Sequence, residues 1–285
     1  MKRLLILHCG PMKTGSTFIQ DILQLNHEEL LKLGIYYCHV RAKNLLNDLE
    51  RVIAGQEFSG NKILLLSSEF FCQQDSVFLK KALASFDGER HAILISRPLR
   101  EVYPSLYLQN LKGSSKRITS FKIFLERQIA VDMMTNKGLG GQLMNAPALD
   151  ARLLDAGLKT HWIRYSRREL LSRFFETLEL ITGIALGHLA AAELDKPLGL
   201  SPRRSLRMEL AGLARAINYL NKINILSECL RERLLIFLLN VSERMNHWFG
   251  FTSPLRQSQL DRCNEVDRLV NQAFLSQFWD CGDTK

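Results

Sequence analysis

The chain has 285 residues, of which 46% are hydrophobic and 24% charged, so it can bury one large core and is too apolar for a disordered protein. Its net charge of +9 comes from lysines and arginines scattered along the sequence, which argues against the basic, aromatic-interleaved stripe of a nucleic-acid-binding protein. The six cysteines form no C-x-x-C pair and no metal-ligand spacing, which predicts reduced thiols and no metal site.

The first predicted strand, Leu4 to Leu7, is followed by a glycine turn and then by a helical pattern. The turn, residues 8–17, reads His-Cys-Gly-Pro-Met-Lys-Thr-Gly-Ser-Thr. Backbone N–H groups of a strand-to-helix turn converge on one point, and the helix N-terminus adds about half a positive charge there. Lys13 adds a full positive charge, so the turn predicts a binding site for a phosphate-like anion. The predicted contacts are Lys13, Thr14, Gly15, Ser16 and Thr17.

The order of residues in this turn differs from the loop that binds ATP or GTP, G-x-x-x-x-G-K-[ST], in which the lysine follows the final glycine. Here Lys13 comes two residues before Gly15. The turn therefore fits a nucleotide kinase or NTPase poorly, and this class of enzyme is kept only as an alternative hypothesis. It is weakened further because no predicted strand ends in an aspartate suited to magnesium.

The turn leads into a helix predicted over Ser16 to Leu33, with apolar residues near the helical period and Gly34 as its C-terminal cap. The next buried strand is Ile63 to Leu66, and Glu69 follows it closely. Because the carboxyl ends of parallel strands meet at one edge of a sheet, this order places Glu69 at the same edge as Lys13.

A third strand, Ala92 to Ile95, runs into Ser96-Arg97-Pro98 and then into a helical pattern that contains Ser105. The guanidinium of Arg97 offers paired charge-assisted hydrogen bonds that suit a doubly charged phosphate, and a hydroxyl fills a remaining acceptor site. The alternative is that Arg97 caps a strand and Ser105 belongs to an ordinary helical turn. Taken alone, these residues leave both interpretations open.

These two elements resemble those of the sulfotransferases that use 3′-phosphoadenosine 5′-phosphosulfate (PAPS), in particular the bacterial and carbohydrate-type branch. The Lys-Thr-Gly-Ser-Thr order at residues 13–17 is similar to that family's 5′-phosphosulfate loop, and Arg97 and Ser105 have the spacing of its 3′-phosphate contacts. The resemblance covers roughly residues 1 to 185. It implies PAPS as the cofactor and transfer of its sulfuryl group to a hydroxyl of an acceptor, for which a glycan or glycolipid is expected.

The resemblance also implies catalytic roles for two residues at this edge of the sheet. Lys13 stabilises the charge that grows on the departing phosphate oxygen, and Glu69 is the general base for the acceptor hydroxyl. His8 is the rival base, or else a polar residue that packs beneath the turn. Glu69 has a structural alternative too, in which Ser67 or Ser68 caps a helix and the carboxylate complements its dipole.

The alternation of buried strands with helices predicts an α/β fold, with a P-loop-like central parallel sheet flanked by helices and a helical C-terminal extension. The fourth strand, His161 to Tyr165, ends in a tyrosine that the resemblance places near the adenine. The alternative is a tyrosine packed in the core with its hydroxyl outward. We expect a single domain over residues 1–285, with a cofactor-binding core at 1–185 and a helical part at 186–285.

Helical periodicity without strand signals continues through Met208–Leu220, Leu226–Met245 and Leu260–Phe274. The apolar run Leu234–Leu239 is far shorter than the roughly twenty residues that span a bilayer, so it predicts a core or interface helix. A homodimer seam and contact with a lipid-linked acceptor are the alternatives, which leaves monomer, homodimer and peripheral membrane contact open. Residues 131–146, which hold three closely spaced glycines, predict a mobile loop.

The apolar run that begins at Leu4 enters the glycine turn too early for a signal peptide, so we expect a cytoplasmic protein. An anionic cofactor and an anionic glycan would account for the positive charge through electrostatic steering, and no nucleic-acid partner is expected. The non-enzymatic alternative is a basic module that binds a nucleotide or nucleic acid and catalyses nothing.

Overall fold

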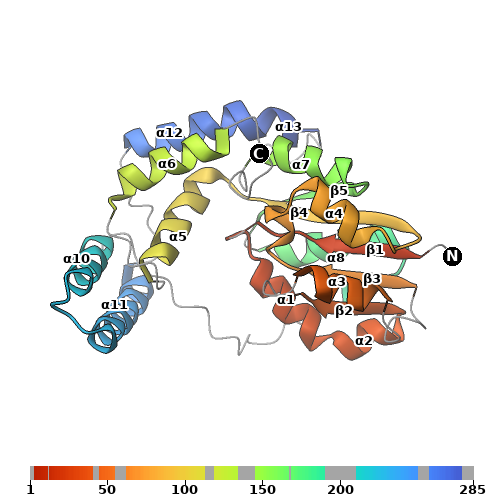
Figure 1. The fold of residues 1–285 in the computed structure, drawn as a ribbon, viewed down its shortest axis with the longest axis horizontal. Coiled ribbons are helices and arrows are strands. Elements are labelled where there is room, and N and C mark those ends of the chain that lie inside the picture. The colour runs from red at the N-terminus through yellow and green to blue at the C-terminus, as the bar shows by residue number, and fades with distance from the viewer. Residues whose placement is uncertain are drawn as a thin grey trace. The chain divides into compact units, whose positions relative to one another are not determined.

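The computed structural model describes residues 3–11, 13–40, 45–54, 62–112, 119–133, 145–166, 168–189, 210–249 and 257–277. The chain divides into two compact units, shown as ribbons in Figure 1. The first consists of Met1–Arg97, Val131–Pro197 and Arg268–Lys285, and the second of Pro98–Ala130 and Leu198–Asp267. Whether the chain behaves as a single domain in solution stays a prediction.

The first unit is built on a five-stranded, all-parallel sheet with the strand order β2-β3-β1-β4-β5. The strands are β1 (Leu4–His8), β2 (Ile35–His39), β3 (Ile63–Ser67), β4 (Glu89–Ser96) and β5 (Lys159–Arg164). Central β1 pairs with both β3 and β4, and its last residue, His8, is level with Ser67 and Ile93. The predicted α/β class is confirmed, and so is the convergence of three strand ends at one edge.

Sequence reasoning missed β2 and joined two helices into one. The helix expected over Ser16–Leu33 is in fact α1 (Ser16–Leu25) and α2 (His27–Lys32), separated by Asn26, whose ψ of 17° departs from the α-helix. Gly34, with a φ of 79°, then turns the chain directly into β2. The long helix was therefore a wrong prediction, because asparagine is tolerated in helices and gives no clear stop signal.

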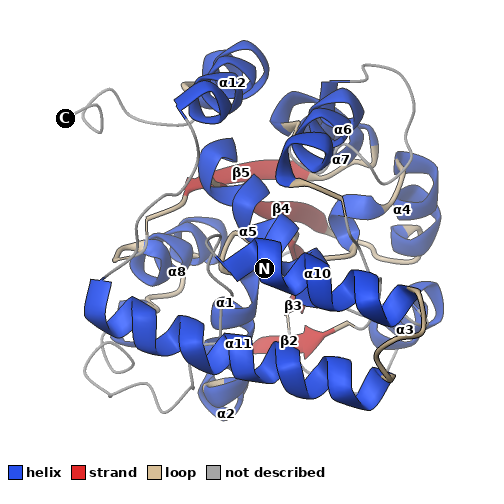
Figure 2. Cartoon of the chain, turned by 90° about the vertical axis from the view of Figure 1, so that its left-hand side faces the viewer, coloured by secondary structure: helices blue, strands red, loops and turns tan. Residues whose placement is uncertain are grey.

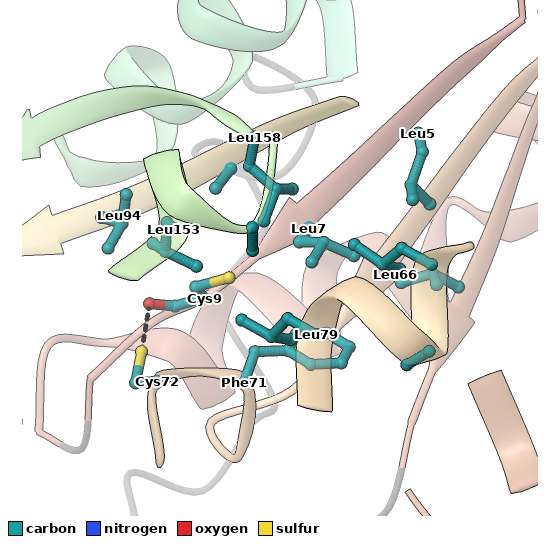
Figure 3. Close-up of a cluster of buried hydrophobic side chains, with 14 of the residues drawn as sticks. Leu5, Leu7, Cys9, Leu66, Phe71, Cys72, Leu79, Leu94, Leu153 and Leu158 are labelled. Carbon is teal, nitrogen blue, oxygen red and sulfur yellow. Dashed lines mark hydrogen bonds between the residues drawn. The ribbon is translucent and has the colours of Figure 1, made fainter. Parts of the chain in front are cut away.

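One face of the sheet is covered by α3 (Leu45–Ala54), α4 (Ser76–Leu83) and α7 (Ala146–Asp155). Their apolar side chains form a buried cluster with alternate residues of β1, β3 and β4. Figure 3 labels several of its members: Leu5, Leu7, Leu66, Leu79, Leu94, Leu153 and Leu158. Complete burial of one leucine side chain contributes about 2 kcal/mol, so this cluster is a main source of stability for the first unit.

The opposite face of the sheet packs against α1 and α8 (Leu170–Thr182). Gln20 of α1 donates a hydrogen bond to Ser67 of β3, and Phe174 of α8 packs edge-on against His8 of β1. A five-residue π-helical segment, η5 (Arg268–Gln272), and α13 (Ala273–Leu275) complete this unit. Helices therefore flank both faces of the sheet, as the alternation of strands and helices predicted.

The second unit is helical and contains α5 (Leu99–Lys112), α10 (Ala211–Lys222), α11 (Glu228–Phe249), α12 (Gln257–Asp267) and α6 (Phe121–Met133) as far as Ala130. Figure 2 shows α10 and α11 lying side by side. Buried Asn218 of α10 joins three helices, because it donates to the carbonyl of Leu111 in α5 and accepts from Nε of Arg231 in α11. The predicted helical C-terminal region is confirmed.

The apolar run Leu234–Leu239 lies within α11 and contains both buried and exposed side chains. Leu235 and Leu238 are buried, whereas the side chains of Ile236 and Phe237 are 53% and 60% exposed. In the part of the chain that the structure describes, no helix is both long and apolar enough to cross a membrane. The glycines of the predicted loop, at 138–141, lie outside the described residues.

Candidate anion-binding site

The glycine turn begins at the end of β1 and closes onto the first residue of α1. The N–H of Cys9 donates to the carbonyl of Ile93, which extends the pairing with β4 one residue beyond β1. Lys13 and Gly15 then have φ values of 70° and 89°, both in the left-handed region. That conformation costs a lysine about 1 kcal/mol or more, and such strain is typical of functional sites.

Two glycines of the turn occupy positions where a side chain would collide with its surroundings. A Cβ atom at Gly10 would lie 2.1 Å from Oγ of Ser16, and one at Gly15 would lie 2.5 Å from Cδ2 of Leu170. Gly15 is also the N-cap residue of α1, and no side chain caps the helix there. The first N–H groups of α1 are therefore left without the side-chain acceptor that an N-cap serine or aspartate supplies.

Buried hydroxyl groups hold the turn closed from within. Oγ1 of Thr14 donates to the carbonyl of Pro11 at 2.6 Å, and Oγ of Ser16 donates to the same carbonyl at 3.4 Å. Thr17, in the first turn of α1, is partly exposed. The hydroxyls of Thr14 and Ser16 thus shape the turn, and contact of these predicted residues with a ligand stays a prediction.

Arg97, the residue after β4, links the end of that strand to the glycine turn. Its Nη1 donates to the carbonyl of Lys13 at 2.7 Å. The guanidinium also lies over the ring of Tyr165, with Cζ 4.4 Å from the ring centroid. Tyr165 directly follows β5, and its N–H donates to the carbonyl of Ser96. Three residues predicted from separate parts of the sequence, Lys13, Arg97 and Tyr165, are therefore in contact at one edge of the sheet.

Glu69 lies in the turn that follows β3, next to the end of β1. The N–H of Ser68 donates to the carbonyl of His8, and Oγ of Ser68 accepts from the N–H of Phe70. A short 3₁₀ helix, η3 (Phe71–Gln73), follows. The side chain of Ser68 thus supports this turn, but it does not cap η3, whose N-cap residue Phe70 has no side-chain cap. Glu69 itself is half-buried.

The segments after β1 and β3 are tied together beneath the surface. Figure 3 shows Sγ of Cys72 donating to the carbonyl of Cys9 at 2.8 Å. Arg152 of α7 donates in turn to the carbonyl of Cys72. Burial raises the pKa of the Cys72 thiol to about 12, with Arg152 lowering it and the Glu69 carboxylate raising it.

His8 is fully buried beneath the glycine turn. Its Nδ1 forms a hydrogen bond with Oγ of Ser67 at 2.8 Å, and Nε2 has no hydrogen-bond partner among the described residues. Burial, assisted by the charge of His39, lowers the pKa of His8 to about 3. A neutral, buried imidazole of such low basicity is a poor general base near pH 7. The packing interpretation of His8 is therefore favoured over the catalytic one.

Ser105 lies on α5 in the second unit, one residue after Pro104, and is half-buried. Its predicted partnership with Arg97, the last residue of the neighbouring segment of the first unit, stays a prediction. The second unit also contains a cavity of about 580 Å³ that sequence reasoning did not predict. Its lining comprises Ser120, Phe121, Lys122, Leu125, Glu126, Ser258, Gln259 and Arg262.

Two residues that support the edge of the sheet carry no sequence motif and were not predicted. Leu170 fills the space beside Gly15, and Arg152 holds the carbonyl of Cys72. Within the described residues, no group of three or more histidine, cysteine, aspartate or glutamate side chains is arranged to hold a metal ion.

No model of a known protein family matches this chain, and no curated protein matches it. The fold and the geometry of the site therefore carry the functional argument. A five-stranded parallel sheet of order 2-3-1-4-5, with a glycine turn after its central strand, is compatible with the nucleotide-binding enzymes of the P-loop type.

Proposed function

We propose that the protein is a sulfotransferase that uses PAPS. The observation that supports the proposal is the hydrogen bond from Arg97 to the carbonyl of Lys13, which joins the two predicted anion-binding elements at one edge of the sheet. PAPS carries a phosphosulfate on its 5′ oxygen and a phosphate on its 3′ oxygen, so a protein that selects it needs two cationic elements close together. An arginine that only capped the end of β4 would have no need to bind the glycine turn that follows β1.

The residues present fit the 5′ group. Gly15 leaves the N-terminus of α1 without a side-chain cap, so its N–H groups and the helix dipole favour an anion there. Lys13 supplies the neighbouring positive charge, and Thr17 in the first turn of α1 is partly exposed. Ser105 is the proposed hydroxyl partner of Arg97 for the 3′-phosphate.

When bound, the donor supplies a sulfuryl group whose sulfur–oxygen bond to phosphate breaks as the acceptor oxygen bonds to sulfur. Lys13 stabilises the negative charge that develops on the phosphate side. Glu69 takes the proton of the acceptor hydroxyl, which would otherwise be a weak nucleophile. His8 is not assigned this role, because it is fully buried and burial lowers its pKa to about 3. Adenosine 3′,5′-bisphosphate and a sulfated acceptor, for which a glycan or glycolipid is proposed, are the products.

Calorimetric titration with adenosine 3′,5′-bisphosphate, adenosine 5′-monophosphate and ATP with magnesium tests the proposal. We expect the bisphosphate to bind without metal and about tenfold or more tightly than the monophosphate, because a charge-assisted arginine–phosphate contact is worth about 1.5–3 kcal/mol. Preference for ATP with magnesium would favour the kinase hypothesis. Failure of all three nucleotides to bind would overturn the proposal.

A positive titration leads to the acceptor. Incubation with ³⁵S-labelled PAPS and separate pools of bacterial polysaccharide, glycolipid and small phenols then identifies the acceptor class by transfer of label. Transfer to the saccharide-containing pools is the expected result. Transfer to phenols alone would contradict the proposed acceptor class while leaving the reaction type standing.

A further inference from the structure

We propose that Tyr165 is a positioning residue: its ring fixes the Arg97 guanidinium against the glycine turn and thereby sets the selectivity for a nucleotide with a 3′-phosphate. The inference rests on the proposed function and deepens it. It also replaces the role expected for Tyr165 beside the adenine with one that acts through Arg97.

The contacts of Arg97 support this role. At one edge of the guanidinium, Nη1 donates to the Lys13 carbonyl at 2.7 Å. The face of the guanidinium lies over the Tyr165 ring, with Cζ 4.4 Å from the ring centroid. The backbone N–H of Tyr165 donates to Ser96, the residue before Arg97, at 2.8 Å. The ends of β4 and β5 are therefore locked together where the side chains stack.

The ring of Tyr165 is itself held in place by the turn. A Cβ atom at Gly15 would lie 3.6 Å from Cε2 of Tyr165, so the ring lies close to the backbone of the N-cap residue. Leu170 lies on the same side of Gly15 and is 4% exposed. The stack thus links Arg97 to the residue that begins α1.

Physical chemistry gives this arrangement a consequence for binding. A free arginine side chain has to be ordered before it can grip a phosphate, at a cost of up to about 2 kcal/mol of rotamer entropy. The cation–π contact and the Lys13 carbonyl order Arg97 beforehand. Removing the ring therefore weakens only those ligands that use Arg97, whereas a tyrosine that stacked on adenine would affect every adenine nucleotide.

The test compares the affinities of Tyr165→Leu and Tyr165→Phe for two probes, adenosine 3′,5′-bisphosphate and adenosine 5′-monophosphate, by calorimetry. For Tyr165→Leu we expect the bisphosphate to bind about tenfold more weakly and the monophosphate to change by less than about twofold. Tyr165→Phe keeps the ring and should retain most of the wild-type selectivity. Equal weakening of both probes by Tyr165→Leu would overturn the inference, and so would unchanged binding of both.

Leu170→Ala is the matched control, because Leu170 packs beside Gly15 with no described contact to Arg97. Any loosening of the turn itself should weaken both probes by the same factor in this variant. An Arg97→Gln background supplies the second check, since Tyr165→Leu should then cause no further loss of bisphosphate affinity. A full additional tenfold loss there would show that Tyr165 acts independently of Arg97.

The design separates the two proposals. If the wild-type protein binds neither probe, the proposed function fails before any variant is compared. If the wild type selects the bisphosphate and Tyr165→Leu retains that selectivity, only the role of Tyr165 fails. Thermal unfolding of each variant shows whether a loss of binding of both probes comes from misfolding.

Discussion

At the scale of single residues, Glu69 stands in a turn that is held partly by bonds of its neighbours. The turn is set by the backbone bond from Ser68 to His8, by Oγ of Ser68, and by the 3₁₀ helix that follows. Replacing Glu69 by glutamine keeps the size and hydrogen-bonding capacity of the side chain and removes only its charge and basicity. This makes Glu69 a site where chemistry and structure can be separated by mutation.

Glu69→Gln is expected to bind adenosine 3′,5′-bisphosphate with nearly wild-type affinity and to lose most sulfuryl transfer, by a factor of about 10²–10⁴ that is typical of a general base. The measurements are calorimetry and the rate of label transfer from PAPS. Glu176→Gln, at an exposed position of α8, is the matched control and should keep full activity. Unchanged turnover in Glu69→Gln would rule out its role as the base.

At the scale of elements, the glycine turn is shaped by packing as much as by backbone freedom. Gly15 and Gly34 both have left-handed φ values, 89° and 79°, but only Gly15 is crowded by a neighbouring side chain. Among the described residues other than its two chain neighbours, no atom lies within 4 Å of the Cβ position at Gly34. The two glycines therefore separate backbone strain from steric collision.

Gly34→Ala should lower the free energy of unfolding by about 1 kcal/mol, the cost of a left-handed alanine, and leave nucleotide affinity unchanged. Gly15→Ala adds a collision with Leu170 and should cost about 3 kcal/mol or more, with bisphosphate binding weakened at least tenfold. Urea unfolding and calorimetry measure the two effects. Equal losses of stability and affinity in both variants would contradict the packing argument.

In the second unit, Asn218 supports the helices through two hydrogen bonds made inside the protein. Asn218→Ala leaves the Leu111 carbonyl and one donor of Arg231 without these partners, and should lower the free energy of unfolding by about 3 kcal/mol. Exposed Glu232 of α11 provides the control, since its alanine variant should change the free energy by less than about 0.5 kcal/mol. Urea unfolding monitored by circular dichroism at 222 nm measures both, and equal effects would show that the buried bonds contribute little.

At the scale of the whole molecule, buried histidines make stability depend on pH. Burial lowers the pKa of His8 to about 3 and of His161 to about 4, and it lowers the pKa of His91 as well. Nδ1 of His91 lies 2.9 Å from Nε2 of His161, so the two rings cannot both be protonated at low cost. All three groups bind protons more readily in the unfolded chain, where the pKa is near 6.5.

Stability contributed by these neutral histidines is fully present above pH 6.5 and is lost as pH falls toward 4 and then 3. His8 alone should cost about 2 kcal/mol at pH 5 relative to pH 7.5. Urea unfolding at these two pH values measures the difference, and His8→Asn should reduce it. The same free energy of unfolding at both pH values would show that burial does not lower the pKa of these histidines.

The buried centre of the sheet was the most predictable part of this fold. The continuous apolar runs of β1, β3 and β4 identified the centre of the sheet, because strands covered on both faces are apolar throughout. The edge strand β2 escaped notice, since its burial alternates over Ile35–His39. Apart from Gly34, no turn signal precedes β2, so the strand is hard to distinguish in the sequence from the helical patterns on either side of it.

The position of these candidate residues at one edge of the sheet was predictable from the sequence, whereas their side-chain contacts were not. Lys13, Glu69 and Arg97 follow strands directly, and parallel topology brings their backbones to one edge. No sequence rule indicates that Arg97 donates to the Lys13 carbonyl or stacks on Tyr165, because both contacts depend on side-chain rotamers and on the register of β4 with β5. The support from Leu170 and Arg152 likewise becomes visible only once the helices are packed.

Because β1 lies at the centre of the sheet and comes first in the chain, both strands that pair with it are synthesised after it. β1 emerges with both of its edges bare, and β3, the first strand that pairs with it, is completed only roughly sixty residues later, about 3–12 seconds at ordinary rates of synthesis. During that interval an apolar strand is exposed to chaperones and to neighbouring nascent chains. Slowing initiation, which spaces neighbouring nascent chains apart on one message, should therefore raise the yield of folded protein.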